Sequence, residues 1–159
     1  MAGPDPTGVR RADVADARAV ARLLHDFNLE FDEPSPPVDE LAVRIEQLLR
    51  DGDVTVLLVG GGPDGLAVLR FRPAIWSSGL ECYLAELYVT PARRGRGSGR
   101  ALLEAALHEA RARGADTMDI GVDAPDLAAR RLYESLGFTN RCGDADDAVM
   151  YVYERDLRG

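Results

Sequence analysis

A glycine-rich turn, residues 94–99 (RGRGSG), stands between a segment of alternating character, 84–89, and an amphipathic run, 101–107. A turn of this kind that opens a helix exposes several backbone N–H groups that have no partner inside the helix. These amides and the positive end of the helix dipole together favour an anion such as a phosphate or a pyrophosphate. The turn therefore predicts a ligand that carries phosphate.

Two widespread phosphate-binding fingerprints do not fit this turn. The dinucleotide pattern G-x-G-x-x-G needs a glycine where Arg100 stands. The P-loop needs a lysine, and all 19 residues counted as Lys or Arg are arginine. The absence of lysine also excludes a Schiff base, or pyridoxal phosphate, anchored through a lysine of these residues.

The turn is locally basic although the chain as a whole is acidic, with a net charge of −8. Arg93, Arg94, Arg96 and Arg100 place four cations within eight residues. Cations at a helix N-terminus oppose the helix dipole unless an anion is present. The overall negative charge disfavours nucleic acid as that anion, so a small phosphate-bearing molecule is indicated.

The pattern Arg94-x-x-Gly97-x-Gly99 resembles the signature of the GNAT superfamily of N-acetyltransferases. A second stretch, residues 126–138 (DLAARRLYESLGF), looks like the family's N-x-x-A-x-x-L-Y-x-x-x-G-F segment and follows about 30 residues later. A strand-like segment, 118–122, separates the two motifs, and the resemblance covers about residues 84–140. The departure is Asp126, where the family usually has asparagine; a carboxylate cannot donate the N–H of an amide.

This resemblance implies an α+β (α/β mixed) fold, with a central, mostly antiparallel mixed sheet of six to seven strands and helices on both faces. It implies one N-acetyltransferase domain over residues 1–159, in which residues 1–7 are flexible. Acetyl-CoA would be the co-substrate, without a metal, and the acetyl group would pass directly to a primary amine of a small molecule or a protein. A non-catalytic module that binds or senses acyl-CoA on the same fold is the alternative.

The resemblance also implies which residues hold the thioester and assist its cleavage. Backbone groups of the strand before the turn would hold the pantetheine arm and the acetyl carbonyl. Tyr133 lies where the family commonly has a tyrosine near the cofactor sulfur. Because a tyrosine titrates near 10 and a thiol near 8.5, full proton transfer is uphill by roughly 2 kcal/mol, and a strong hydrogen bond is expected instead. The implied cofactor-binding residues are Leu87, Tyr88, Val89, Arg94, Gly95, Arg96, Gly97, Ser98, Gly99, Arg100, Asp126 and Ala129.

Glu86 is the candidate for the base, because an alkyl amine with a pKa near 10.4 is only about 0.04% neutral at pH 7. It stands just before the residues that would hold the pantetheine arm. By strand alternation it shares one face with Cys82, Leu84 and Tyr88. A water that relays the proton could take its place. Two other strand residues are rivals for this role: Glu81 and Tyr83.

The acceptor amine is predicted from charge. The first two helices and their connection usually shape the acceptor pocket in this family, and here that region is rich in carboxylates. Such a cluster would attract a cationic amine, whereas a solvated acidic helix face that keeps the protein soluble is the other interpretation. The carboxylates are Asp26, Glu30, Asp32, Glu33, Asp39 and Glu40.

Length and composition favour one ordinary globular domain that is cytoplasmic. No apolar run approaches the 18 residues of a membrane span, and the N-terminus does not have the pattern of a signal peptide. Two cysteines fit a reducing compartment, and two isolated histidines give no metal site. The apolar segment 148–153 makes a homodimer conceivable.

Periodicity and turn residues predict eleven elements in a fixed order. Strands are expected at 9–12, 54–59, 66–71, 80–90, 116–123, 138–141 and 148–155. Helices are expected at 13–31, 38–52, 97–113 and 125–136.

Overall fold

The computed structural model describes residues 8–143 and 148–159. The chain forms two compact units, one that runs through Ile120 and one that begins at Gly121. The helices and strands of the first unit are β1 (Val9–Arg11), α1 (Ala17–Glu30), α2 (Val38–Asp51), β2 (Thr55–Val59), β3 (Gly65–Pro73), β4 (Leu80–Val89), α3 (Ser98–Ala112) and β5 (Ala115–Ile120). The second unit contains α4 (Leu127–Ser135).

The strands of the first unit form one mixed sheet with the order β1-β2-β3-β4-β5. The first four strands are antiparallel to their neighbours, and β5 pairs parallel to β4. A parallel pair needs a crossover connection, which α3 supplies between β4 and β5. The prediction of a mixed and mostly antiparallel sheet is therefore confirmed.

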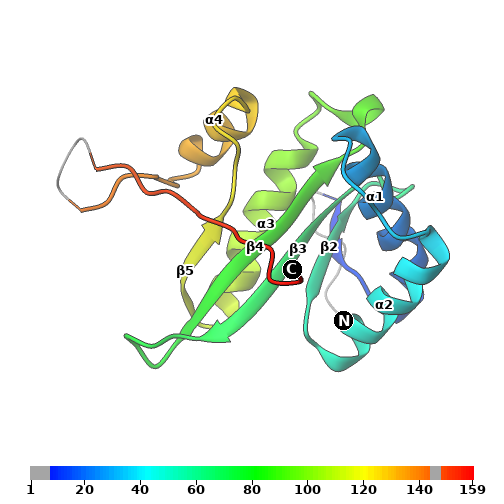
Figure 1. The fold of residues 1–159 in the computed structure, drawn as a ribbon, viewed down its shortest axis with the longest axis horizontal. Coiled ribbons are helices and arrows are strands. Elements are labelled where there is room, and N and C mark those ends of the chain that lie inside the picture. The colour runs from blue at the N-terminus through cyan, green and yellow to red at the C-terminus, as the bar shows by residue number, and fades with distance from the viewer. Residues whose placement is uncertain (1–7, 144–147) are drawn as a thin grey trace. The chain divides into compact units, whose positions relative to one another are not determined.

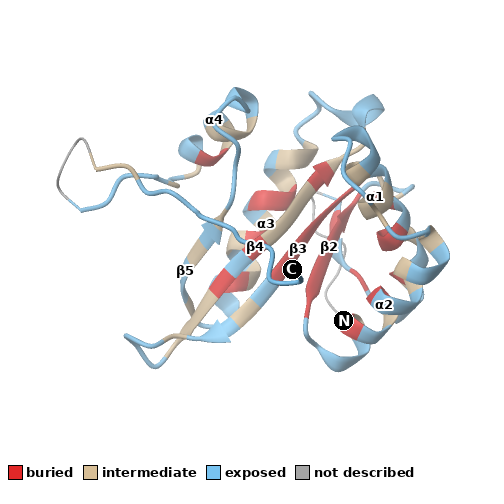
Figure 2. Ribbon diagram, viewed as in Figure 1, coloured by how far each residue is buried: buried red, intermediate tan, exposed pale blue. Residues whose placement is uncertain are grey.

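Helices cover both faces of this sheet, as predicted (Figure 1). α1 and α2 pack together over the face that carries Val56, Leu58 and Leu66, and we call this the α1/α2 face. α3 contacts β2, β3, β4 and β5 on the opposite face, where its Leu102 and Leu103 are fully buried. Buried residues concentrate on the central strands between these layers (Figure 2).

α2 illustrates how local sequence sets an element. Apolar side chains at Leu41, Ile45 and Leu48 recur at helical spacing and pack into the α1/α2 core. Pro37 precedes the first turn, and Gly52 follows the last one with a φ of 75°. This left-handed conformation suits glycine, which has no Cβ, and it ends the helix where the sequence predicts.

β4 contains an irregularity that changes the faces of its side chains. The register pairs Val68 of β3 with Glu86, and then Leu69 with Leu84, so that Ala85 has no partner opposite. One extra residue of this kind is a β-bulge, which breaks the alternation of a strand between its two sides. The two halves of β4 therefore follow different phases.

The bulge corrects the predicted neighbours of Glu86. Tyr88 belongs to the α1/α2 core, and Glu86, two residues before it, lies on the same face as predicted. Leu84 and Cys82 precede the bulge and are buried on the opposite face, where Phe71, the partner of Cys82, is covered by Arg113 at the end of α3. The predicted shared face of Glu86 with Leu84 and Cys82 is wrong, because alternation was counted through the extra residue.

The second unit lacks the two strands that were expected at its end. Residues 138–141 and 148–155 form no strand in the described parts, and only an isolated bridge joins Arg141 to Val149. Tyr151, Val152 and Tyr153 have high strand propensity but are largely exposed. A β-prone stretch becomes a strand only where a partner completes its hydrogen bonds, so the described sheet has five strands instead of six to seven.

No helix in the described residues is long and apolar enough to cross a membrane.

Candidate functional site

The glycine-rich turn connects the end of β4 to the start of α3. One 3-10 turn, Pro91–Arg93, follows the strand. Gly95 and Gly97 then take positive φ angles of 75° and 84°. A residue with a Cβ pays roughly 1–2 kcal/mol for this left-handed conformation. The glycine spacing therefore serves a backbone turn that starts α3 at Ser98.

The amides of this turn have no acceptors. Gly97 is the N-cap of α3, and no side chain accepts a hydrogen bond from the first helical turn. Across residues 8–143 and 148–159, the N–H groups of Gly95, Arg96, Gly97, Ser98 and Gly99 donate no hydrogen bond. Unpaired N–H groups at the positive end of a helix of 15 residues suit a phosphate group well.

Three of the arginines near the turn differ in their pairing. Arg93 lies 3.7 Å from a carboxylate oxygen of Asp64, and Arg100 lies 3.8 Å from Glu104 one turn along α3. Arg96 is exposed and forms no ion pair within the described chain. Arg96 is therefore the cation of this group that is available to an anion held by the turn.

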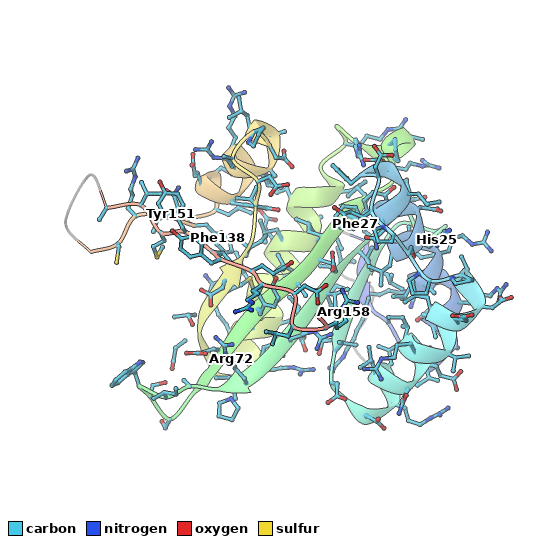
Figure 3. The ribbon with its side chains drawn as sticks, viewed as in Figure 1. His25, Phe27, Arg72, Phe138, Tyr151 and Arg158 are labelled. Atoms are coloured by element: carbon cyan, nitrogen blue, oxygen red, sulfur yellow. The ribbon has the colours of Figure 1, made fainter. Side chains whose placement is uncertain are left out.

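Arg94 ties the turn to α1. Its Nη2 donates to both carboxylate oxygens of Glu30, at 2.6 and 2.9 Å, and its Nε donates to the carbonyl oxygen of Val89 at 3.0 Å. The guanidinium lies 5.7 Å from the centre of the Tyr88 ring, and the Tyr88 hydroxyl donates to Glu30 at 3.4 Å. Phe27 of α1, labelled in Figure 3, stacks on the same ring, and the two centroids are 4.9 Å apart. The Arg94 side chain thus holds the end of β4 against α1.

β4 presents one open backbone edge beside this turn. β5 pairs with β4 only from Leu80 to Leu84, whereas β3 pairs with it as far as Val89. The edge of residues 85–89 that faces away from β3 has no strand partner in the described parts of the chain. This segment includes Leu87 and Tyr88. An unpaired strand edge offers N–H and C=O groups to an extended ligand.

Glu86 lies within this open segment and is half-buried on the α1/α2 face. Burial raises the pKa of its carboxyl group above the ordinary value of 4.5, and the guanidinium of Arg70 lowers it in part. A carboxylate with a raised pKa is a stronger proton acceptor near neutral pH. The environment of Glu86 therefore suits a base.

The two rivals of Glu86 have other surroundings. Glu81 accepts a hydrogen bond from Arg72 Nε at 2.5 Å, so its charge is already neutralised. Tyr83 is 45% exposed on the same face of the sheet. Both lie beyond the bulge from Glu86, toward the start of β4.

Asp126 is the N-cap of α4 in the second unit. Its Oδ1 accepts a hydrogen bond from the N–H of Ala129 at 3.0 Å. Aspartate and asparagine serve equally well in this role, because only the side-chain oxygen is used. The departure from the family's asparagine is therefore compatible with a well-formed start of α4.

Tyr133 lies in the last half of α4, and the residue is 8% exposed. The ring packs against Phe138, with centroids 6.1 Å apart. Burial, together with the negative charge of Asp126, raises the pKa of its hydroxyl to about 12. The hydroxyl has no hydrogen bond to the described residues, and it is not sealed from solvent. It is thus a neutral donor.

The predicted site residues are distributed over both units. Glu86, residues 87–89 and residues 94–100 lie together where β4 leads into α3 of the first unit. Asp126, Ala129 and Tyr133 share α4 and its cap in the second unit.

Sequence reasoning missed two features of the first unit. It assigned Glu30 to an acceptor-attracting cluster, whereas Glu30 is paired with Arg94. It also passed over Arg70, whose charge reaches Glu86. In the same acidic cluster, Asp39 pairs with Arg18 at 2.7 Å. Attraction of a cationic acceptor stays a prediction. No group of three or more side chains able to hold a metal occurs in the described residues.

The chain is similar to known acetyltransferases. Residues 20–138 match the family described as Acetyltransferase (GNAT) family. The chain is 41% identical over 136 residues to a mycothiol acetyltransferase of Kineococcus radiotolerans, which covers 84% of this chain and 42% of that relative. It is 45% identical over 53 residues to an L-methionine sulfoximine/L-methionine sulfone acetyltransferase of Salmonella typhimurium, over 33% of this chain and 31% of that relative.

The fold has a close counterpart among solved structures. The crystal structure of a candidate acetyltransferase from Arthrobacter sp. FB24 is 47% identical, superposes with a TM-score of 0.87, and covers 98% of this chain and 99% of that one. The chain spans less than half the length of the Kineococcus mycothiol acetyltransferase that it matches. The family match nevertheless extends over most of its residues and includes both motifs. The chain belongs to the acetyltransferase (GNAT) family.

Proposed function

We propose that this protein transfers an acetyl group from acetyl-CoA directly to a primary amine, most simply that of a small molecule. One observation carries the proposal. A run of unpaired amides at the start of α3 lies directly beyond the open edge of β4. These features fit an extended molecule that carries a diphosphate at one end. The names of two relatives, which refer to mycothiol and to L-methionine sulfoximine, favour a small acceptor over a protein.

The residues of the first unit fit such a donor. The N–H groups of residues 95–99 would bind the diphosphate, and Arg96 would add an unpaired positive charge. Arg94 would act by positioning, because its guanidinium is engaged with Glu30 and Val89. Arg100, the third residue of α3, would add positive charge next to the amide of Gly99.

The N–H groups of Leu87 and Val89, which face away from β3, would stabilise negative charge on the acyl oxygen, since fixed donors need little reorganisation. The N–H of Tyr88 faces β3, like that of Thr90, which donates to Asp64. In the second unit, Asp126 and Ala129 would contribute to binding of the donor by fixing the start of α4, where the Asp126 carboxylate accepts a hydrogen bond from the N–H of Ala129. When bound, acetyl-CoA supplies an activated acyl group and a thiol as leaving group.

Two side chains would then handle protons. Glu86 would accept the proton of the acceptor ammonium, directly or through a water, since its raised pKa makes it a better base than an exposed glutamate. Tyr133 would donate a hydrogen bond to the departing sulfur. With a pKa of about 12 it stays protonated, so it stabilises the sulfur without surrendering its proton.

Calorimetric titration separates the parts of the donor. CoA and 3′-dephospho-CoA, which both contain the diphosphate, are expected to bind, whereas pantetheine, which lacks it, is expected to bind far more weakly. If pantetheine binds as well as CoA, the amides of the turn are not the binding site. Release of free thiol from acetyl-CoA in the presence of amines tests the transfer itself. Uptake of CoA without thiol release from any acceptor would support the non-catalytic binding module instead.

A further inference from the structure

A charged groove with a volume of about 400 Å³ opens on the sheet of the first unit. Residues of α2, β3, β4 and β5 line it. It lies near the end of β3 that carries Arg72, which is labelled in Figure 3. Charged side chains come from α2, the residue pair after it, β3, β4 and β5. They are Arg44, Asp53, Arg70, Arg72, Glu81 and Asp119.

The arginines of the groove are not equally available. Arg72 is neutralised by Glu81 at 2.5 Å. Within residues 8–143 and 148–159, the side chains of Arg44 and Arg70 form neither a hydrogen bond nor an ion pair. Arg44 and Arg70 are both exposed. The groove therefore offers two guanidinium groups to an anion from outside.

The negative charges of the groove balance these two cations. Asp53 and Asp119 likewise have no ion-pair partner for their carboxylates in the described chain. A site with two free charges of each sign is complementary to a molecule that itself carries both signs. It is less complementary to a polycation, which would meet Arg44 and Arg70 on entry.

Arg70 connects the groove to the proposed base. β3 pairs Val68 with Glu86, and Arg70 follows two residues later on the same face, about 7 Å further along the strand. Its charge lowers the pKa of Glu86. A molecule held by Arg70 at its anionic end could therefore place an amine at Glu86.

We propose that the charged groove binds the carboxylate of an amino-acid acceptor through Arg70, assisted by Arg44, while the amine of that acceptor faces Glu86. This inference rests on the proposed function and names its substrate class. A guanidinium binds a carboxylate with two parallel N–H···O hydrogen bonds, and this geometry gives orientation as well as affinity. Orientation matters here because the amine must reach the thioester at a fixed distance.

Matched acceptors test the proposal. A panel of amino acids is compared with their carboxamides and with the corresponding decarboxylated amines, by thiol release from acetyl-CoA. The parent acids are expected to have a kcat/KM at least about tenfold higher than either derivative, which is the scale of a hydrogen bond to a charged group. A carboxamide has the more acidic ammonium group, so intrinsic reactivity favours the derivative and cannot produce this result.

Three variants locate the effect. Arg70→Gln is expected to raise KM for the acids about tenfold or more and to leave the affinity for CoA unchanged, while Arg70→Lys retains part of the preference for acids. Arg50→Gln is the control. Arg50 is also an exposed arginine, but it lies on α2 and pairs with Glu46 outside the groove. Arg50→Gln removes the same charge from the chain and should not alter the preference.

Equilibrium binding gives an outcome independent of turnover. Binding of the same acids to the CoA-loaded protein is measured by saturation-transfer NMR for the wild type and Arg70→Gln. Three results would overturn the inference and leave acetyl transfer intact. They are equal turnover of acids and derivatives, a preference for polyamines, and an affinity for acids that Arg70→Gln does not change. If no acceptor causes release of thiol from acetyl-CoA, but acids still bind and Arg70→Gln weakens their binding, the proposed function is refuted and the binding of acids in the groove is supported.

Discussion

Replacement of Tyr133 by phenylalanine removes a single hydroxyl group whose surroundings allow a quantitative prediction. The pKa of about 12 lies about 3.5 above that of a free thiol near 8.5. Complete proton transfer to the departing sulfur would therefore cost roughly 5 kcal/mol, which leaves hydrogen bonding as the useful contribution.

A hydrogen bond to a charged partner contributes about 1.5–3 kcal/mol. Tyr133→Phe should therefore lower kcat by about 10- to 150-fold. The free energy of unfolding should change by less than about 0.5 kcal/mol, because the hydroxyl bonds to none of the described residues. The shape of the pH profile below about pH 11 should also stay the same, since the wild-type hydroxyl does not ionise in that range.

The assay follows thiol release at saturating acetyl-CoA, with CoA affinity measured by calorimetry and stability by urea unfolding. Tyr153→Phe is the control, because Tyr153 is 90% exposed in the same unit. An unchanged kcat for Tyr133→Phe would remove the hydroxyl from the mechanism. If the wild type loses activity as the pH rises just above neutral, and Tyr133→Phe does not, the raised pKa of Tyr133 is contradicted.

Further substitutions, with their controls, test the turn, the base and the cap. Gly97→Ala should lower the free energy of unfolding in urea by about 1–2 kcal/mol, because the φ of Gly97 is 84°. A Cβ there would meet no neighbouring atom, so the loss would come from backbone strain alone. Gly61→Ala, at a position without a positive φ, should be nearly neutral, and equal losses at both positions would argue against strain. Glu86→Gln should lose the acid limb of kcat/KM. Its stability relative to the wild type should rise with pH from 4.5 through the raised pKa, because within that window the folded wild type holds a proton that the unfolded chain has released, so the wild type loses stability as the pH rises; a constant difference would exclude burial as the cause of the raised pKa. Asp126→Asn should unfold like the wild type, whereas Asp126→Ala should lose about 1 kcal/mol by thermal unfolding; equal stability of all three would mean that the cap is unimportant.

Elements set by local chemistry could be predicted from the sequence. α2 was expected over 38–52 and extends from Val38 to Asp51, because Pro37 and the left-handed Gly52 fix its ends. The first helix was expected to begin after Asp13. Instead, a 3-10 turn, Val14–Asp16, intervenes and Asp13 caps that turn, while α1 begins at Ala17. Caps define where a helical region starts but not which type of helix comes first.

Features that depend on distant partners could not be predicted in this way. The bulge at Ala85 depends on the register between β3 and β4, and alternation along one strand gives no sign of it. The pairing of Arg94 with Glu30 joins residues 64 positions apart. Both motifs located the turn and α4, yet the engagement of individual side chains depends on the tertiary packing.

The extra residue in β4 restricts where the length of this chain can change. Removal of Ala85 would restore a regular pleat with Glu86 still opposite Val68 and Leu84 still opposite Leu69. Removal of Leu87 would instead place Glu86 opposite Ala67 and turn its side chain to the other face of the sheet. The hairpin tip at 74–79 holds exposed Ile75 and Trp76, and insertions there would leave the pairing of the strands in phase. Length differences among homologues should therefore gather at that tip or at position 85, and spare residues 86–89.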